Sequence, residues 1–161
     1  MAQIIAAFFK GSSRLDKLIR WESRGVYSHV AFIIDDVLYE AQAPYGVRLI
    51  KDKSQIKTYL SECPVDYFSI EVTDDQKAKC KAFADKQLGK KYAYKLVLYF
   101  LYKATVDSRK ASGKWFCSEY FFETLNQGGI PLLARVSSWL VNPTVASYSE
   151  KLIPTTFQIQ P

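Results

Sequence analysis

Residues 25–42 of the chain read Gly25-Val26-Tyr27-Ser28-His29-Val30-Ala31-Phe32-Ile33-Ile34, then Asp35-Asp36, then Val37-Leu38-Tyr39-Glu40-Ala41-Gln42. Two runs rich in β-branched and aromatic residues flank a pair of aspartates, which is the pattern of an antiparallel hairpin with a short turn. This hairpin predicts an antiparallel sheet, and the other elements are expected to pack around it.

Strand patterns lie mostly in the first half of the chain and helix patterns mostly in the second. Apolar runs predict strands over 3–9, 47–50 and 65–72, with a last strand over 153–159. Helical spacing predicts helices over about 13–22, 73–88, 92–106 and 117–127, a short helix after Ser54 and one more turn that begins at Pro143. Strands and helices that do not alternate predict an α+β fold, with the antiparallel sheet packed against helices.

The composition predicts one globular domain that spans residues 1–161. The chain has 161 residues, of which 48% are hydrophobic and 15% aromatic, so it can bury a substantial core. The net charge of +6 permits anionic partners, but the lysines are dispersed and no nucleic-acid-binding motif accompanies them. We therefore expect no nucleic-acid partner.

The three cysteines are Cys63, Cys80 and Cys117, and their number and wide spacing suggest neither a disulfide framework nor a zinc site. We expect a reducing compartment, no metal and no cofactor. The N-terminus lacks a basic segment followed by a long apolar core, and the run from Leu96 to Tyr102 is too short to span a bilayer. A cytoplasmic protein without an integral membrane segment is expected.

A second informative stretch is Lys114-Trp115-Phe116-Cys117-Ser118-Glu119-Tyr120. Apolar residues recur after it at helical spacing until Gly128-Gly129, so we expect a helix that begins at Cys117. The first turn of a helix carries unpaired N–H groups and a partial positive charge, and both favour a thiolate over a thiol. Cys117 is therefore a candidate nucleophile, although a cysteine among aromatic residues is also an ordinary part of a core.

His29 is the only histidine in the chain, so it is the only imidazole that Cys117 could use as a base. A catalytic imidazole needs a partner on its second nitrogen, which fixes the tautomer and stabilises the imidazolium. Counting back from a two-residue turn at Asp35-Asp36 places His29 opposite Gln42 and diagonal to Glu40, with all three side chains on one face. The hairpin thus supplies a carboxylate and an amide as candidate partners, and a register slip of one residue would remove both.

Six short motifs, taken together, resemble one enzyme family. They are Ser28-His29-Val30-Ala31-Phe32-Ile33, Leu38-Tyr39-Glu40-Ala41, Gly46-Val47, Leu88-Gly89-Lys90-Lys91-Tyr92, Trp115-Phe116-Cys117-Ser118-Glu119 and Asn142-Pro143-Thr144. Their order is similar to that of the circularly permuted, YiiX/YaeF-like branch of the NlpC-type papain-like cysteine peptidases and amidases, in which the histidine precedes the cysteine. The resemblance spans roughly residues 28–145 and implies a circularly permuted papain-like fold from a bacterium or bacteriophage.

By position, the resemblance implies that Cys117 is the nucleophile, His29 the base and Glu40 the residue that orients the base. Hairpin geometry alone keeps Gln42 as the second choice for the orienting residue. The implied activity is that of a thiol hydrolase, which cleaves an amide or peptide bond through a thioester, for example in cell-wall peptides. The family often has glycine where this chain has Ala31, a conservative departure on a strand.

Two alternative functions are also considered. An acyltransferase or lipid/ester hydrolase of the lecithin:retinol acyltransferase-like type would use the same site, and the aromatic stretch from Tyr92 to Tyr102 would suit an acyl chain. Such a stripe is more often the core-facing side of a helix. A non-catalytic basic module would instead use lysine and aromatic side chains to bind a partner. The two enzymatic readings share one substrate class: a small peptide, amide or acyl compound.

Overall fold

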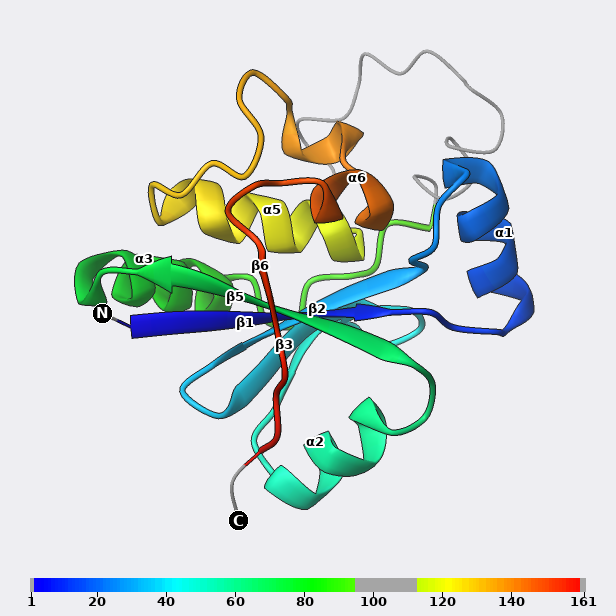
Figure 1. Cartoon of the computed structure of the whole chain (residues 1–161), viewed down its shortest axis with the longest axis horizontal. Helices are drawn as coiled ribbons and strands as arrows, with labels where there is room; N and C mark the ends of the chain where they lie inside the picture. Colours follow the sequence, from blue (N-terminus) through cyan, green and yellow to red (C-terminus); the bar gives the residue numbers. More distant parts are fainter. Residues whose placement is uncertain (1, 95–112, 160–161) are drawn as a thin grey trace.

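The computed structural model describes residues 2–94 and 113–159, and its architecture is α+β, as the sequence predicts (Figure 1). A six-stranded sheet has the order β4-β3-β2-β1-β5-β6, and each neighbouring pair is antiparallel. The strands are β1 (Ala2–Phe9), β2 (His29–Ile34), β3 (Val37–Gln42), β4 (Gly46–Ile50), β5 (Val65–Val72) and β6 (Ile153–Thr155). The helices are α1 (Arg14–Ser23), α2 (Lys53–Leu60), α3 (Asp74–Lys86), α5 (Cys117–Gln127), the 3₁₀ turn η2 (Ser138–Leu140) and α6 (Pro143–Ser147).

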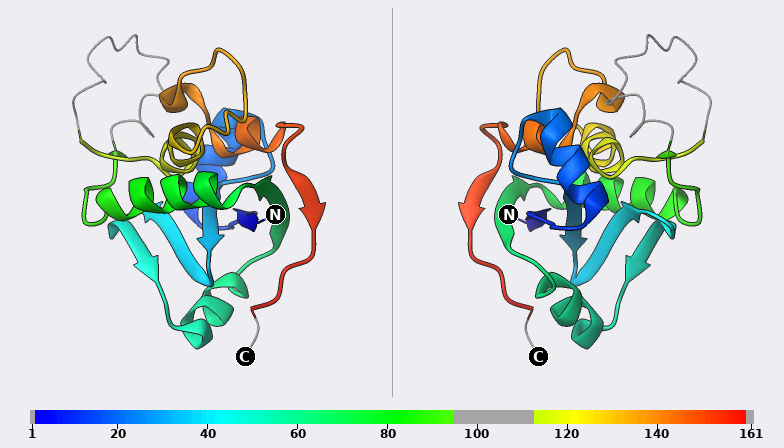
Figure 2. Two further views of the ribbon diagram at one scale, coloured as in Figure 1. Left: turned by 90° about the vertical axis from the view of Figure 1, so that its left-hand side faces the viewer. Right: turned by 90° about the vertical axis from the view of Figure 1, so that its right-hand side faces the viewer.

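Helices cover both faces of the sheet. Helices α3, α5 and α6 lie on one side and α2 lies on the other, as the two side views show (Figure 2). The larger core joins the sheet to α5 through buried aromatic rings, among them Phe8, Phe32 and Phe121. A smaller core on the opposite face contains Phe9 and Ile56, the latter from α2. Alternate residues of the central strands therefore enter different cores, as the period of a strand requires.

The register of the β2–β3 hairpin is the predicted one, because Ile34 pairs with Val37 across the turn. Strand β2 begins at His29, not at Gly25 as the sequence pattern indicates. The backbone N–H of Gly25 donates to the Arg20 carbonyl at 3.0 Å, and that of Tyr27 donates to Thr144 Oγ1 at 3.3 Å. Since these donors serve other elements, residues 25–27 do not join the ladder.

Other boundaries differ from the predicted ones for local reasons. Helix α2 begins at Lys53, before Ser54, because the side chain of Asp52 caps it by accepting from the Gln55 N–H at 3.0 Å. Strand β6 ends at Thr155, so the predicted strand over 153–159 is too long, and Phe157 instead packs on Tyr67 with ring centroids 5.8 Å apart.

The helix predicted over 92–106 falls largely outside the described residues. Within the described part, Tyr92 forms a parallel bridge with Trp115. The Trp115 N–H donates to the Lys91 carbonyl at 3.1 Å, and the Ala93 N–H donates to the Trp115 carbonyl at 3.0 Å. These hydrogen bonds hold the backbone directly before α5. In the two described ranges, no helix is long and apolar enough to cross a membrane.

Candidate active site

His29 is the first residue of β2, directly after the segment that connects α1 to this strand. Its neighbour Ser28 fixes this position, because the Ser28 hydroxyl accepts from the Gly11 N–H at 3.1 Å and the Ser28 N–H donates to the Phe9 carbonyl at 2.9 Å. The ring of Phe9 packs against the His29 ring with centroids 5.2 Å apart. His29 is thus held at the end of a central strand and is only 9% exposed.

Glu40 is the hairpin residue that contacts the histidine. Its Oε2 lies 2.8 Å from Nε2 of His29, and its side chain is completely buried. A carboxylate only accepts hydrogen bonds, so Nε2 of His29 carries the proton in this contact. The contact is the one that the predicted hairpin register allows.

Gln42, the alternative partner, is engaged elsewhere. Its Oε1 accepts a hydrogen bond of 2.9 Å from Nη2 of Arg48 on β4. Arg48 is in turn the cross-strand partner of Glu40. Glu40 therefore contacts the histidine ring, whereas Gln42 contacts Arg48.

Cys117 is the first residue of α5 and is 1% exposed. Its side chain lies close enough to the His29 ring to raise the pKa of that ring. Because Nε2 contacts Glu40, Nδ1 is the ring nitrogen that is left to exchange a proton with the thiol. The structure brings the three predicted residues together in the order Cys117, His29, Glu40.

The residues after the cysteine hold the helix in place. The Ser118 hydroxyl donates to the Val141 carbonyl, and Glu119 accepts from the Phe116 N–H at 3.4 Å. Both contacts support the start of α5. Directly after Val141, helix α6 brings Thr144 against Tyr27, close to the start of β2. The N-terminus of α5 and the start of β2 are thus tied to the same segment.

The contacts around His29 favour its protonated form. Burial is the largest influence and lowers the pKa of His29, but hydrogen bonds with Cys117 and Glu40 and the negative charges of both raise it from 6.5 to about 10. Burial opposes ionisation of Glu40, whereas contacts with His29, Tyr59 and Arg48 outweigh burial and lower the pKa of this carboxyl. An imidazolium between two acidic groups is the charge state that this geometry stabilises.

Two residues that the sequence analysis did not identify complete the surroundings of Glu40. Arg48 donates from Nε to Glu40 Oε1 at 2.7 Å, and the Tyr59 hydroxyl donates to Glu40 Oε2 at 2.6 Å. Extending the hairpin register across the turn to β4 would have found Arg48. Nothing in the local sequence pattern indicates that Tyr59, on α2, would reach the hairpin.

Tyr92 lies within electrostatic range of the cysteine. Burial and the negative charge of Cys117 raise the pKa of Tyr92 well above 10, so its hydroxyl group stays protonated. Its ring packs on Phe116 with centroids 5.8 Å apart. The hydroxyl of Tyr27 donates to Asp66 Oδ2 at 2.6 Å and thereby ties the start of β2 to β5.

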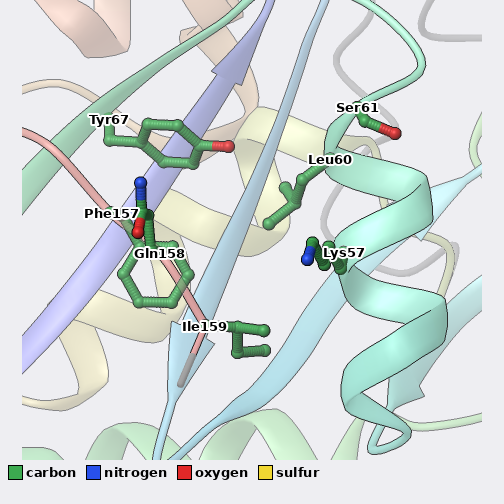
Figure 3. Close-up of a pocket in the computed structure, with 7 residues that line it drawn as sticks. All are labelled: Lys57, Leu60, Ser61, Tyr67, Phe157, Gln158 and Ile159. Atoms are coloured by element: carbon green, nitrogen blue, oxygen red, sulfur yellow. The ribbon is translucent and has the colours of Figure 1, made fainter. Parts of the chain in front are cut away.

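A hollow of about 330 Å³ lies apart from these residues, on the α2 side of the sheet (Figure 3). Its walls come from α2, β5 and the C-terminal segment: Lys57, Leu60, Ser61, Tyr67, Phe157, Gln158 and Ile159. It includes none of the three candidate residues. Across residues 2–94 and 113–159, no group of three or more His, Cys, Asp and Glu side chains is placed to hold a metal ion.

The chain was compared with protein-family models and with curated proteins. No protein-family model matches the chain, and no curated protein matches its sequence. The functional argument therefore depends on the geometry and chemistry of the residues described above.

Proposed function

We propose that this protein is a thiol hydrolase that cleaves an amide bond, such as that of a small peptide, through a thioester on Cys117. The observation that carries the proposal is a buried histidine ring that contacts the Glu40 carboxylate through Nε2 and has the Cys117 side chain near enough to raise its pKa. The proposal includes the circularly permuted papain-like fold. The order of the motifs is similar to that of this family, and an antiparallel sheet covered by α5 is compatible with its fold.

In the first half-reaction, Nδ1 of His29 already holds the proton of Cys117, and the thiolate attacks the carbonyl carbon. The carbon–nitrogen bond then breaks as His29 returns the proton to the leaving amine, which leaves an acyl thioester on the enzyme. The backbone N–H of Cys117 would donate to the developing oxyanion, a contribution of about 3–4 kcal/mol per donor in comparable sites.

In the second half-reaction, His29 removes a proton from water as the water oxygen attacks the thioester. The carbon–sulfur bond breaks, the acid is released, and the proton stays on His29 beside the regenerated thiolate. Glu40 holds the Nε2 proton throughout, which keeps Nδ1 free to exchange a proton with the reacting groups.

The first experiment uses p-nitrophenyl acetate, because a small activated ester suits a buried thiol. We expect a burst of p-nitrophenol and an acetyl group on Cys117, detected by peptide mass spectrometry. Cys117→Ala should abolish the burst, and His29→Ala should slow it by about 100-fold or more. Cys63→Ser is the matched control, since Cys63 is another free cysteine and lies outside the site. Acetylation elsewhere with Cys117 unmodified would overturn the proposal.

The acyl acceptor separates hydrolysis from acyl transfer. From position 95 onward, the stretch from Tyr92 to Tyr102 that prompted the acyltransferase alternative falls outside the described residues. The proposal is therefore limited to hydrolysis. Adding a primary amine or glycerol to the ester reaction should leave acetate as the main product, whereas predominant transfer to the added acceptor would identify an acyltransferase.

A further inference from the structure

The carboxylate of Glu40 accepts hydrogen bonds from three different side chains and uses both of its oxygens. Oε1 receives Nε of Arg48 at 2.7 Å and lies 2.6 Å from Nη2 of the same guanidinium. Oε2 receives Nε2 of His29 at 2.8 Å and the Tyr59 hydroxyl at 2.6 Å. A carboxylate has about four lone-pair sites, so the acceptor capacity of Glu40 is fully used.

Arg48 is fixed by contacts on several sides. Its Nη2 also donates to Gln42 Oε1 at 2.9 Å, and its guanidinium lies over the Tyr45 ring, 4.1 Å from the centroid. A two-nitrogen contact with a carboxylate has a defined geometry that a lysine does not reproduce. Arg48 thus limits rotation of the Glu40 carboxylate from the side opposite His29.

Tyr59 limits the same carboxylate from α2. Its ring packs on Phe9 with centroids 5.2 Å apart, and Phe9 packs on the His29 ring at the same centroid separation. Burial and the charge of Glu40 raise the pKa of Tyr59 far above 10, so its hydroxyl is a donor at every working pH. Tyr59 and His29 donate to the same oxygen, and each therefore weakens that oxygen as an acceptor for the other.

The charged groups of this network alternate in sign. Arg48 is positive and Glu40 negative, a protonated His29 is positive, and a Cys117 thiolate is negative. Glu62 also acts on Tyr59, and Tyr92 lies within the electrostatic range of Cys117. Arg48 repels the imidazolium and shares the charge of Glu40, so its effect opposes that of Glu40 on the ring.

We infer that Arg48 and Tyr59 are positioning residues that set the orientation of His29 and how tightly it holds its proton, by sharing the carboxylate of Glu40. The catalytic meaning of this inference rests on the proposed thiol hydrolase, but its geometric content concerns the histidine ring alone. The inference predicts that removing Arg48 or Tyr59 strengthens the interaction of Glu40 with the imidazolium and so raises the pKa of His29.

The experiment is an NMR titration of the imidazole ring, which is unambiguous because the chain has a single histidine. In ¹⁵N-labelled protein, Arg48→Gln should raise the pKa of His29 by about one unit, and Tyr59→Phe should raise it by a smaller amount. Arg48→Lys keeps the charge but loses the two-nitrogen contact, so the pKa should stay near the wild-type value. In the ester reaction, the basic limb of the pH–rate profile should move in the same direction as the ring pKa.

Arg14→Gln and Tyr67→Phe are the matched controls. Arg14 is an exposed arginine on α1, and Tyr67 belongs to the core on the α2 face. Far-UV circular dichroism confirms that each variant is folded, and Tyr59→Phe and Arg48→Lys are mild enough to remain informative if Arg48→Gln is not. Ring titrations of Arg48→Gln and Tyr59→Phe that coincide with the wild type would overturn the inference. If the titrations shift but Cys117 is never acylated, the inference about the ring holds and the proposed function fails.

Discussion

At the scale of single residues, the cost of burying Glu40 explains why so many donors surround it. A carboxylate that is completely removed from water loses several kcal/mol of hydration unless charged and hydrogen-bonding partners replace it. His29, Arg48 and Tyr59 are those partners. Removing the charge while leaving these donors in place should therefore be more damaging than changing a nearby residue that only one donor contacts.

The substitution Glu40→Gln tests this. The amide would present a donor to groups that are themselves donors, so we expect a loss of about 3–5 kcal/mol in the free energy of unfolding at pH 7. Gln42→Ala, the comparison, should cost about 1 kcal/mol, because it removes one partner of Arg48. Urea denaturation of both variants measures the difference, and equal losses would show that Glu40 is not the central acceptor.

The same substitution has a predictable pH dependence. The pKa of Glu40 is lower in the folded state than its ordinary value of 4.5, so its contribution to stability is present above pH 4.5 and is lost as the pH falls through the folded-state pKa. The gap in unfolding free energy between wild type and Glu40→Gln should thus narrow as the solution is acidified below pH 4.5. A gap that stays constant down to pH 3 would mean that the carboxyl is not ionised in the folded protein.

The contribution of His29 to stability depends on pH in the opposite direction. Its folded-state pKa is raised from 6.5 to about 10, so its contribution to stability is full below pH 6.5 and is lost as the pH rises toward 10. We expect the difference in unfolding free energy between wild type and His29→Gln to decrease over this interval. Because other groups also titrate at alkaline pH, the measured quantity is the difference between the two proteins. A difference that grows with pH would show that the neutral ring is the favoured form.

At the scale of elements, α5 carries the cysteine, and its position depends on close contact with α3. A Cβ atom added at Gly128, at the end of α5, would lie 2.2 Å from Cys80 Sγ on α3. The φ angle of Gly128 is −78°, which any residue adopts, so space and not conformation requires glycine here. The two helices can approach this closely only because one contact residue lacks a side chain.

A double-mutant cycle measures this contact. Gly128→Ala alone should destabilise the protein by about 1–3 kcal/mol through overpacking. In the Cys80→Ala background the added methyl group occupies the space that the sulfur leaves, so its cost should fall by about 1 kcal/mol or more. Urea denaturation of the four proteins gives the interaction energy. An interaction energy near zero would show that α3 and α5 adjust independently of this contact.

Elements with strong local signals could be predicted, and those set by distant contacts could not. The hairpin register followed from the Asp35-Asp36 turn, and the start of α5 followed from the apolar spacing between Cys117 and Gly128-Gly129. The start of β2 depends on Thr144, which is distant in sequence and accepts a hydrogen bond from the Tyr27 N–H. In the same way, the hydroxyl group of Tyr59 reaches Glu40 only because α2 packs on the second face of the sheet.

At the scale of the whole molecule, the candidate site joins the first and last parts of the chain. His29 and Glu40 come from the early hairpin, whereas Cys117 comes from α5, much later in the chain. Surface charge has little part in this assembly. Several of the lysines pair with carboxylates in partly exposed contacts, such as Lys77 with Asp35 at 2.7 Å, and such pairs contribute little to stability. The docking of α5 on the sheet is instead supported by buried aromatic contacts.

Because the site needs the hairpin and α5 at once, enhanced reactivity of Cys117 should disappear when the molecule unfolds as a unit. At pH 6, we expect iodoacetamide to alkylate Cys117 faster than Cys63, because Cys117 lies beside the His29 ring, which can take the proton of the thiol. In a urea series this advantage should vanish at the midpoint measured by far-UV circular dichroism. Peptide mass spectrometry quantifies both cysteines in the same sample, so Cys63 serves as the internal reference. Loss of the advantage well below that midpoint would instead show that α5 separates from the hairpin in a local opening before global unfolding.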